Sequence, residues 1–510
     1  MKLLLPLLLI FSISYSKESD KLRSLYHSLN PNSIKENIAF YSLFNGSDYG
    51  NKALERSMDL INKHRDEKID VKILKNWPSI SLVSMVQSIG KKMNTPSSMI
   101  SYEDVELIGK LSSHLKHHNL PGHQKTHFND INTLTDNEID VARFVFLYQF
   151  NNDLEKVLSY EAALDLMALE ILAKVSPQKT LKELLHAMHE LIFFEMEFRF
   201  PPHSLWAKDV DTYTFLPSVM DDRFGVCLGV SILYIALGQR LGLSFNIFTP
   251  PGHIFIQAKS DDESLVNIET TARGIHIPME QYLGINGLYL EKRTLKETVA
   301  FALMNFAATF WEAKKYEEAL KIYLVCETMM PFDPLLHYFI SINSLFCNKP
   351  KEAKIAYEIY KSNLRKDVIK EETLLEDYFE KKVDVESLKT IFSSVDETRD
   401  SIIKKQEELL KVTKKFPTCR EGFFHLGITY LQLSQLSKAQ AAFDTYHKLD
   451  KTNPTVEYYL AHLCLNRLDY KKAFEHLSET EKLFKAHEKS LKILKPLRME
   501  LMKYICLNPS

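Results

Sequence analysis

The chain has 510 residues, of which 45% are hydrophobic and 25% are charged, as is usual for a globular protein. This length exceeds one compact domain and predicts about three or four folding units. The formal net charge of −2 gives no electrostatic reason to expect nucleic acid or an anionic membrane surface as a partner.

The first residues, MKLLLPLLLIFSISYSKES, have the pattern of an export signal. Lys2 supplies a positive start, residues 3–11 an apolar core, and residues 14–16 a small-x-small cleavage site. The apolar stretch is short for a bilayer, so we expect cleavage rather than anchoring. We therefore predict a signal peptide at 1–16 and an exported protein, periplasmic or secreted, that is not an integral membrane protein.

Residues 17–136 predict a helical N-terminal region whose polar loops are marked by prolines. Its segment HLKHHNLPGHQKTHF is rich in histidine. His114 and His118 would share one face of a helix there and form a possible metal pair. The acidic ligands that usually support such a site are not evident in the pattern. A polar loop is therefore the favoured interpretation, and no metal site is predicted.

Residues 137–296 predict a domain with helices first and strands second. RFPPHSLW ends a helical stretch and leads into a looped segment that closes at Arg223. An apolar helix then starts at Cys227 and stops at Gly242. Three β-like runs follow, SFNIF, HIFIQA and LVNIET.

Residues 297–510 repeat small residues at an interval of 34. The pairs are Ala319 and Ala353, Gly427 and Ala461, and Ala439 and Ala473. This period is typical of tetratricopeptide helix pairs, which stack into an α-solenoid and bind peptides or proteins on a concave face. A charged helical insertion at about 365–415 does not fit the period. We thus predict an α+β chain, mostly α, with a protein partner on the repeats.

Cys227 differs from the other five cysteines in its position. Those five lie in the C-terminal helices, where buried thiols or one unassigned disulfide are expected, and no CxxC zinc pattern occurs. Cys227 instead stands at a helix start, where partial positive charge favours a thiolate and a free N–H faces a developing oxyanion. Gly225 and Gly229 allow close approach of backbone, which leaves room for a substrate.

His253 is the predicted base for this thiol, because it opens a strand directly after a Pro-Pro-Gly turn. If residues 253–258 and 264–269 form a hairpin, one register places His253 opposite Glu269 on the same face. A shift by two residues would bring Asn267 opposite instead. The carboxylate of Glu269 and the amide of Asn267 both remain candidates for the group that orients the imidazole.

The segments GVCLGVSILYIALGQRLGL, TPPGHIFIQA and VNIETTARG, in this order, resemble the transglutaminase-like superfamily, which has a papain-like cysteine fold. They are most similar to its SirB-type bacterial branch, which often carries tetratricopeptide repeats. The resemblance implies a core of one helix and an antiparallel sheet, with Cys227 as nucleophile, His253 as base and Glu269 as orienting acid. The family usually has Asp at the third position. In the SirB-type branch the Cys position is often occupied by a residue that cannot attack.

The resemblance implies a thiol acyl-transfer enzyme acting on a protein or peptide amide. Water as acceptor would make it a peptidase or amidase, and an amine would make it a transglutaminase. This chemistry needs no cofactor, and none is predicted. Thr271, Arg273 and His276 are expected in a structured loop that closes the domain. The alternative function is a non-catalytic adaptor that uses the same core beside peptide-binding repeats.

Overall fold

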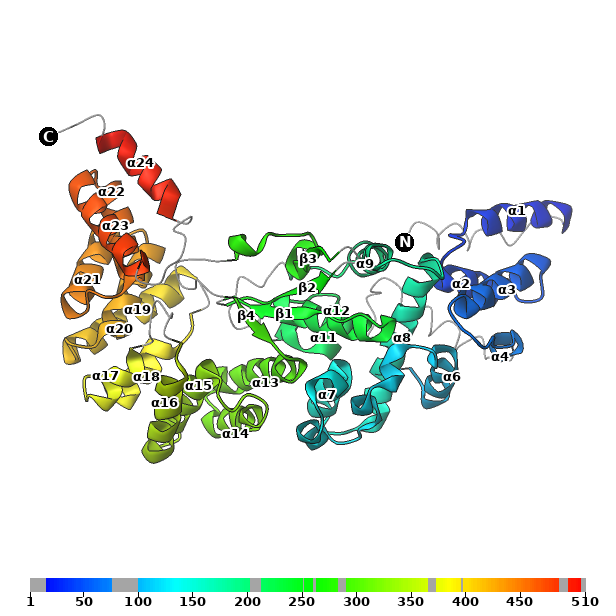
Figure 1. Ribbon diagram of the computed structural model, residues 1–510, viewed down its shortest axis with the longest axis horizontal. Helices are drawn as coiled ribbons and strands as arrows, with labels where there is room; N and C mark the ends of the chain where they lie inside the picture. Colours follow the sequence, from blue (N-terminus) through cyan, green and yellow to red (C-terminus); the bar gives the residue numbers. More distant parts are fainter. Residues whose placement is uncertain are drawn as a thin grey trace.

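The computed structural model describes residues 15–75, 100–201, 212–250, 252–259, 263–282, 290–365, 373–395, 398–485 and 494–505. Apart from Tyr15 and Ser16, the predicted signal peptide lies outside the described residues, as does Cys506. The helices of the N-terminal region lie at one end of an elongated molecule, a small sheet lies in the middle, and stacked helices form the other end (Figure 1).

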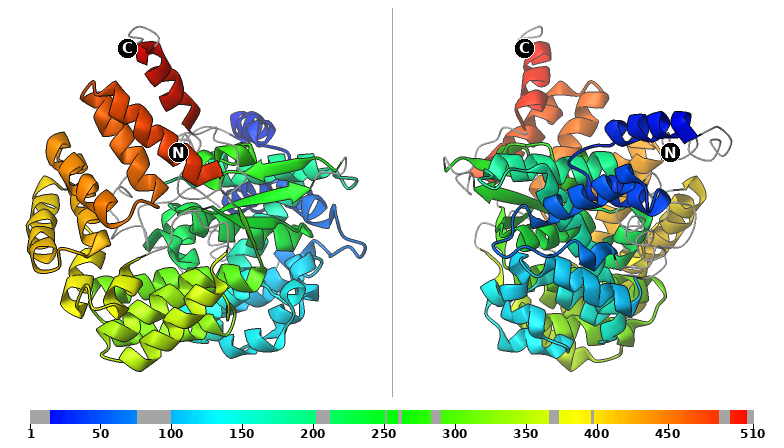
Figure 2. Two further views of the ribbon diagram at one scale, coloured as in Figure 1. Left: turned by 60° about the vertical axis from the view of Figure 1, so that its left-hand side comes forward. Right: turned by 90° about the vertical axis from the view of Figure 1, so that its right-hand side faces the viewer.

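The N-terminal region is helical, as predicted. Its elements are α1 (Tyr15–Ser28), α2 (Ile34–Leu43), α3 (Asp48–Asn62), α4 (Lys72–Lys75), α6 (Tyr102–Ser112) and the 3-10 turns η2 (Lys116–Asn119), η3 (Pro121–Gln124), η4 (Phe128–Thr133) and η5 (Asp136–Glu138). Helices α2, α3 and α6 pack against α8 (Leu154–Lys174) of the next region. One hydrophobic core runs from these helices through the centre to the first repeat pairs. The N-terminal helices therefore form part of the central unit (Figure 2).

The central unit is built around α12 (Cys227–Leu241), which is buried along nearly its whole length. It packs against α7 (Val141–Gln149), α8, η7 (Thr212–Thr214) and α11 (Leu216–Asp222), while α9 (Leu181–His189) and the π-helix η6 (Glu190–Glu195) pack on α8. The predicted helix stop is confirmed, because Gly242 caps α12 in the left-handed region at φ 80°.

The prediction of a loop up to Arg223 was wrong for its last part, which forms α11. Leu216, Val219 and Met220 lie at helical spacing and are buried against the core, so tertiary packing stabilises this short helix. Arg223 ends the helix with a left-handed backbone at φ 58°.

The sheet has four antiparallel strands in the order β3-β2-β1-β4. Its strands are β1 (Asn246–Thr249), β2 (Phe255–Lys259), β3 (Leu265–Ile268) and β4 (Glu291–Arg293), and the turns η8 (Thr270–Ala272) and η9 (Met279–Gln281) follow β3. The three predicted strands are present, and β4 was missed because three charged residues carry no strand pattern. The fold class, α+β and mostly α, is confirmed.

The predicted hairpin register was wrong by two residues. Gln257 pairs with Asn267, whereas the predicted register would pair it with Leu265. A two-residue shift keeps every side chain on its face of the sheet. His253 and Glu269 both lie just outside the paired strands, so loop conformation and not the ladder sets their contact.

The C-terminal helices form the predicted repeat pairs. The pairs are α13 (Leu295–Glu312) with α14 (Tyr316–Glu327), α15 (Pro334–Phe346) with α16 (Pro350–Asn363), α20 (Arg420–Gln432) with α21 (Leu436–Leu449), and α22 (Pro454–Asn466) with α23 (Tyr470–Lys485). The repeated alanines are fully buried, and a Cβ at Gly427 would lie 2.7 Å from the Phe443 ring. Small residues thus stand where the two helices of a pair cross.

The predicted insertion is also helical, with α17 (Leu374–Phe379), α18 (Val385–Phe392) and α19 (Arg399–Lys415), and α24 (Lys495–Ile505) follows the last pair. All five cysteines within the described ranges are free. In the part of the chain that the structure describes, every helix is too short or too polar to cross a membrane.

Candidate active site

Cys227 is the first residue of α12, and its side chain is half-buried. The chain reaches this point along a fixed path, because the Gly225 N–H donates to the carbonyl of Arg199 (3.1 Å) and the Val226 N–H to that of Tyr213 (3.2 Å). The first N–H groups of a helix have no acceptor within the helix. The thiol therefore lies beside free N–H groups at the positive end of α12.

The two glycines near Cys227 do not leave room for a substrate, so that prediction was wrong. A Cβ at Gly229 would lie 2.5 Å from the Tyr213 carbonyl oxygen, and a Cβ at Gly225 would lie 2.5 Å from Val230 Cγ2. The space is filled by the protein itself. These glycines let the segment before α11 pack tightly on α12, and this packing positions the helix start.

His253 lies at the end of a tight turn, directly before β2. Gly252 adopts φ 71°, and the His253 N–H donates to the Pro250 carbonyl at 3.0 Å. The ring is 26% exposed, and its Nε2–H donates to Glu269 Oε2 at 2.7 Å. The Cys227 side chain lies close enough to the ring to raise the pKa of His253. The structure thus brings the three sequence-predicted residues together at one site.

Glu269 lies directly after β3 and is 3% exposed. Besides His253, its carboxylate accepts hydrogen bonds from the Thr271 N–H (3.1 Å), the Thr271 hydroxyl and the Tyr282 hydroxyl (3.0 Å). Its backbone is also fixed, since Glu269 N–H donates to the Ile275 carbonyl at 3.0 Å. A carboxylate that accepts hydrogen bonds from this many donors is held in one orientation, and it therefore fixes the orientation of the His253 imidazole as well.

The charges of these neighbours set the pKa of His253. Burial lowers this pKa, but the hydrogen bonds and negative charges of Cys227 and Glu269 outweigh burial and raise it to about 10. Burial raises the pKa of Glu269, but hydrogen bonds from His253 and Thr271 outweigh it and hold this pKa below its usual value. The geometry therefore favours a protonated imidazole beside the Glu269 carboxylate.

Asn267, the other candidate for the orienting group, does not face His253. Its amide is buried, accepts from Gln257 Nε2 at 2.8 Å and donates to the Ile277 carbonyl at 2.7 Å. Asn267 thus joins two strands and the following loop. The imidazole of His276 accepts the Asn267 N–H at 3.0 Å, so it also belongs to this bracing.

The loop after β3 contributes to the site more than its sequence indicated. Thr271 contacts the Glu269 carboxylate, whereas Arg273 lies over the Phe194 ring at 5.9 Å. Thr270 donates to the Cys227 carbonyl at 3.4 Å and lies 3.2 Å from the Ser231 hydroxyl. Thr270 therefore ties the start of α12 to the strand that carries the acid.

Tyr282 is the site residue that sequence reasoning missed. Its ring stacks on His253 with a centroid distance of 5.8 Å and on Phe255 with 4.0 Å. Its hydroxyl donates to Glu269. No local pattern marks this tyrosine, because its contacts come from residues 13 or more positions earlier in the chain.

Within the described ranges, the side-chain groups that could hold a metal ion lie near η2 and η3, at the opposite end of α12. The chemistry available at Cys227 is therefore that of a thiol, an imidazole and a carboxylate.

Comparison with known proteins identifies the family of the domain that contains Cys227. Residues 158–294 match the family model Transglut_core2, described as the transglutaminase-like superfamily. The matched segment contains Cys227, His253 and Glu269. This chain therefore contains a transglutaminase-like domain; membership of the SirB-type branch stays a prediction.

No curated protein matches the chain. Among solved structures it is similar to pilF of Pseudomonas aeruginosa (16% identity over 41% of this chain and 86% of that chain, TM-score 0.20). It is also similar to MamA of Desulfovibrio magneticus RS-1, with 16% identity over 37% of this chain and 97% of that chain and a TM-score of 0.20. A third similar structure is yeast Tom70, with 10% identity over 96% of this chain and 88% of that chain and a TM-score of 0.23. Scores this low do not establish a shared overall fold.

Proposed function

We propose that the transglutaminase-like domain transfers acyl groups from protein or peptide amides, with Cys227 as nucleophile, His253 as base and Glu269 as orienting acid. The observation that carries this proposal is the hydrogen bond between His253 and Glu269, beside a Cys227 side chain close enough to the ring to raise the pKa of His253. Acyl transfer through a covalent intermediate needs a nucleophile, a base and a group that orients the base, in this order.

In the proposed reaction His253 already holds the proton of the Cys227 thiol, and the sulfur attacks the amide carbonyl carbon. The developing oxyanion is stabilised by free N–H groups at the start of α12. The C–N bond breaks as His253 gives its proton to the leaving amine, which leaves a thioester. Water or a second amine, deprotonated by His253, then attacks the thioester, and the C–S bond breaks to restore the thiolate.

The other parts of the chain support a protein as substrate. Helix pairs of the tetratricopeptide type present extended surfaces that bind peptides or proteins, and we propose that they select the partner. The leader-like residues 1–16 support export of the chain. Attack by water would give a peptidase or amidase, and attack by an amine would give a transglutaminase.

Alkylation of single cysteines tests the proposal. At pH 6 an ordinary thiol of pKa about 8.5 is roughly 0.3% thiolate, whereas a thiol paired with a protonated imidazole is largely thiolate. We expect iodoacetamide to modify Cys227 at pH 6 about 100-fold faster in the wild type than in His253→Ala, as measured by mass spectrometry of the labelled peptides.

Cys347 provides an internal control, because it is also partly exposed but burial raises its pKa. Its slow labelling should be the same in both proteins. If Cys227 reacts as slowly as Cys347, or reacts quickly but independently of His253, the enzyme proposal fails and the adaptor function is favoured.

A further inference from the structure

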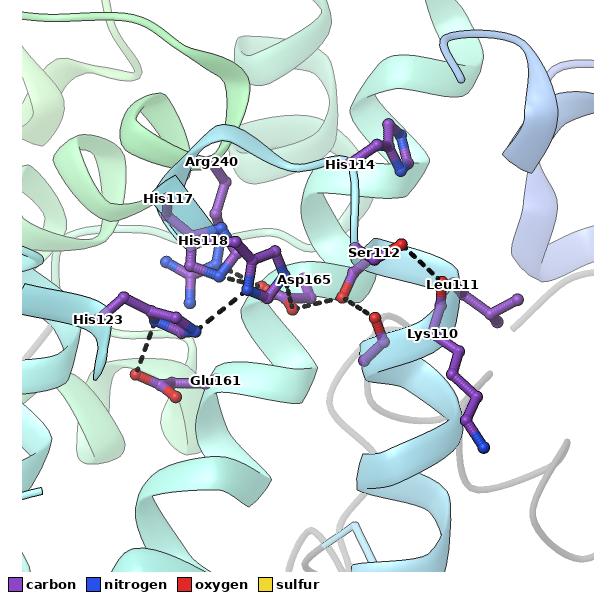
Figure 3. A network of polar contacts seen from close by, with 12 residues as sticks. Lys110, Leu111, Ser112, His114, His117, His118, His123, Glu161, Asp165 and Arg240 are labelled. Carbon is purple, nitrogen blue, oxygen red and sulfur yellow. Dashed lines mark hydrogen bonds and ion pairs between the residues drawn. The ribbon is translucent and has the colours of Figure 1, made fainter. Parts of the chain in front are cut away.

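A second cluster of histidines lies far from the thiol, in the segment that sequence patterns assigned to a polar loop. The segment is not a loop of that kind: His117 and His118 lie in η2, His123 lies in η3, and the His117 ring is fully buried. The predicted pairing of His114 with His118 was also wrong, because α6 ends before His114 and the His114 ring contacts Arg65. His114 stands apart from the cluster (Figure 3).

The three imidazoles of His117, His118 and His123 converge. One nitrogen of each ring lies within 4.8 Å of the corresponding nitrogen of the other two. Figure 3 shows His118 and His123 facing each other, and His118 Nδ1 lies 3.2 Å from His123 Nε2. Zn–N bonds of about 2.0–2.1 Å imply nitrogens about 3.4 Å apart in a tetrahedral site, so the rings need to close by roughly 1.4 Å at most.

Two of the rings have a buried carboxylate behind them. His123 Nδ1 donates to Asp140 at 3.0 Å, which leaves Nε2 to face the other rings. His117 Nε2 lies 3.3 Å from Asp165, and neither nitrogen of this buried ring makes a hydrogen bond. A carboxylate on one nitrogen and an open lone pair on the other is the arrangement that orients metal-binding histidines.

The carboxylates around the cluster are held by other side chains and therefore support the histidines from behind. Asp165 is fixed by Ser112 (2.7 Å) and Arg240 (2.8 Å), and Glu161 pairs with Arg143 at 2.7 Å. Together with Asp140, three carboxyl groups face two guanidinium groups, although burial raises the pKa of Glu161 to about 7. A divalent cation among neutral imidazoles is compatible with this balance.

The location of the histidine cluster at the C-terminal end of α12 also favours binding of a cation. Arg240 lies in the last turn of α12, and a Cβ at the cap Gly242 would lie 3.0 Å from Lys116 of η2. The carbonyl end of a helix carries partial negative charge.

We propose that His117, His118 and His123 bind one divalent transition-metal ion of the Zn²⁺ type, and that this ion joins the N-terminal helices to the C-terminal end of α12. Imidazole ligands suit zinc and its neighbours rather than magnesium or calcium. The side chain of His118 is 26% exposed, which gives the ion and a fourth ligand such as water access to the site. The role is structural, because Cys227 lies about 20 Å away along the helix axis.

The test uses the full chain, produced without a polyhistidine tag and freed of metal with a chelator. We expect the wild type to bind one equivalent of Zn²⁺, and Co²⁺ in its place to give the strong visible absorption of a four-coordinate site. At free Zn²⁺ 100-fold above the dissociation constant, the apparent unfolding constant should fall about 100-fold and the melting temperature should rise.

His118→Ala removes the most exposed ligand and should abolish both the stoichiometric binding and the rise in melting temperature. His114→Ala is the matched control, since it removes a neighbouring histidine outside the cluster, and it should behave as the wild type. Melting in chelator shows whether His118→Ala folds; if it does not, His123→Gln replaces it. The proposal is overturned if the wild type binds no stoichiometric Zn²⁺, or if a folded variant keeps it. Neither result depends on the thiol chemistry.

Discussion

The two ends of α12 place histidines in opposite electrostatic surroundings. At the N-terminal end, His253 lies near the Cys227 side chain and the Glu269 carboxylate, and these neighbours raise its pKa to about 10. At the C-terminal end, burial and the Arg240 charge lower the pKa of His117 and His118. The same side chain is thus suited to carry a proton at one end and an open lone pair at the other.

The largest expected effect is loss of the nucleophile at the first end. Cys227→Ser should lower acyl transfer by roughly 10³-fold or more, because a hydroxyl beside this imidazole is a far weaker nucleophile. The measurement is incorporation of dansylcadaverine into casein, together with release of casein peptides. Cys347→Ser is the control and should retain full activity. Equal activity in both variants would remove Cys227 from the mechanism.

Removing the negative charge behind His253 should have the next largest effect. Glu269→Gln should slow alkylation of Cys227 at pH 6 about tenfold, because the imidazolium loses its anionic partner. Asn267→Ala is the comparison variant. Because Asn267 braces the strands, it should lower the melting temperature and leave the alkylation rate within about twofold. The reverse pattern would make Asn267 the orienting group.

The raised pKa of His253 predicts a pH dependence of stability. A group whose pKa is higher in the folded state stabilises fully below its unfolded pKa, about 6.5, and this contribution is lost as pH rises through the folded value of about 10. Denaturant unfolding of wild type and His253→Gln should show a difference near pH 6 on the order of 1 kcal/mol, after allowance for solvent screening. A difference that grows between pH 6 and 10 would contradict the assigned charge.

Tyr282 should have a smaller effect. Tyr282→Phe keeps the ring that stacks on His253 and removes only the hydroxyl that donates to Glu269. We expect alkylation of Cys227 to slow only about two- to fivefold, because the lost hydrogen bond affects the thiol indirectly, through Glu269 and His253. Tyr282→Leu, which also loses the stack, should be slower than Tyr282→Phe in the same labelling assay. Identical rates for the wild type and Tyr282→Phe would show that the hydroxyl does not position Glu269.

The smallest expected effect tests whether the two ends are independent. His118→Ala should leave alkylation of Cys227 within about twofold of the wild type, because side chains about 20 Å apart with no shared partner act additively. The labelling is done in chelator and again with Zn²⁺. A tenfold change in either condition would show that the ends are coupled through α12.

The sequence located the three residues at the first end because each follows a local signal. Cys227 stands between glycines at a helix start, His253 follows a proline-glycine turn, and Glu269 ends an apolar run. The hairpin register was wrong, but an even shift preserved the face, and the loops beyond the ladder set the contact between His253 and Glu269. The role of these residues in catalysis stays a prediction, as do export and the protein partner.

The second end shows the limit of such signals. The histidines of the second cluster were taken for a polar loop because their local pattern lacks acidic ligands. The carboxylates come from α7 and α8, at positions 140, 161 and 165, and Arg240 comes from the far end of α12. Only the folded chain brings these charges together.

The sequence by itself determined the helix–strand order of the central domain, the 34-residue repeat and the start and stop of α12, because periodicity, small residues and glycine caps act over short distances. The tertiary structure decided which side chains meet: Tyr282 with Glu269, Gly229 with the Tyr213 carbonyl, and His117 with Asp165. These contacts join segments that are distant in sequence, and their geometry depends on how whole helices and loops pack.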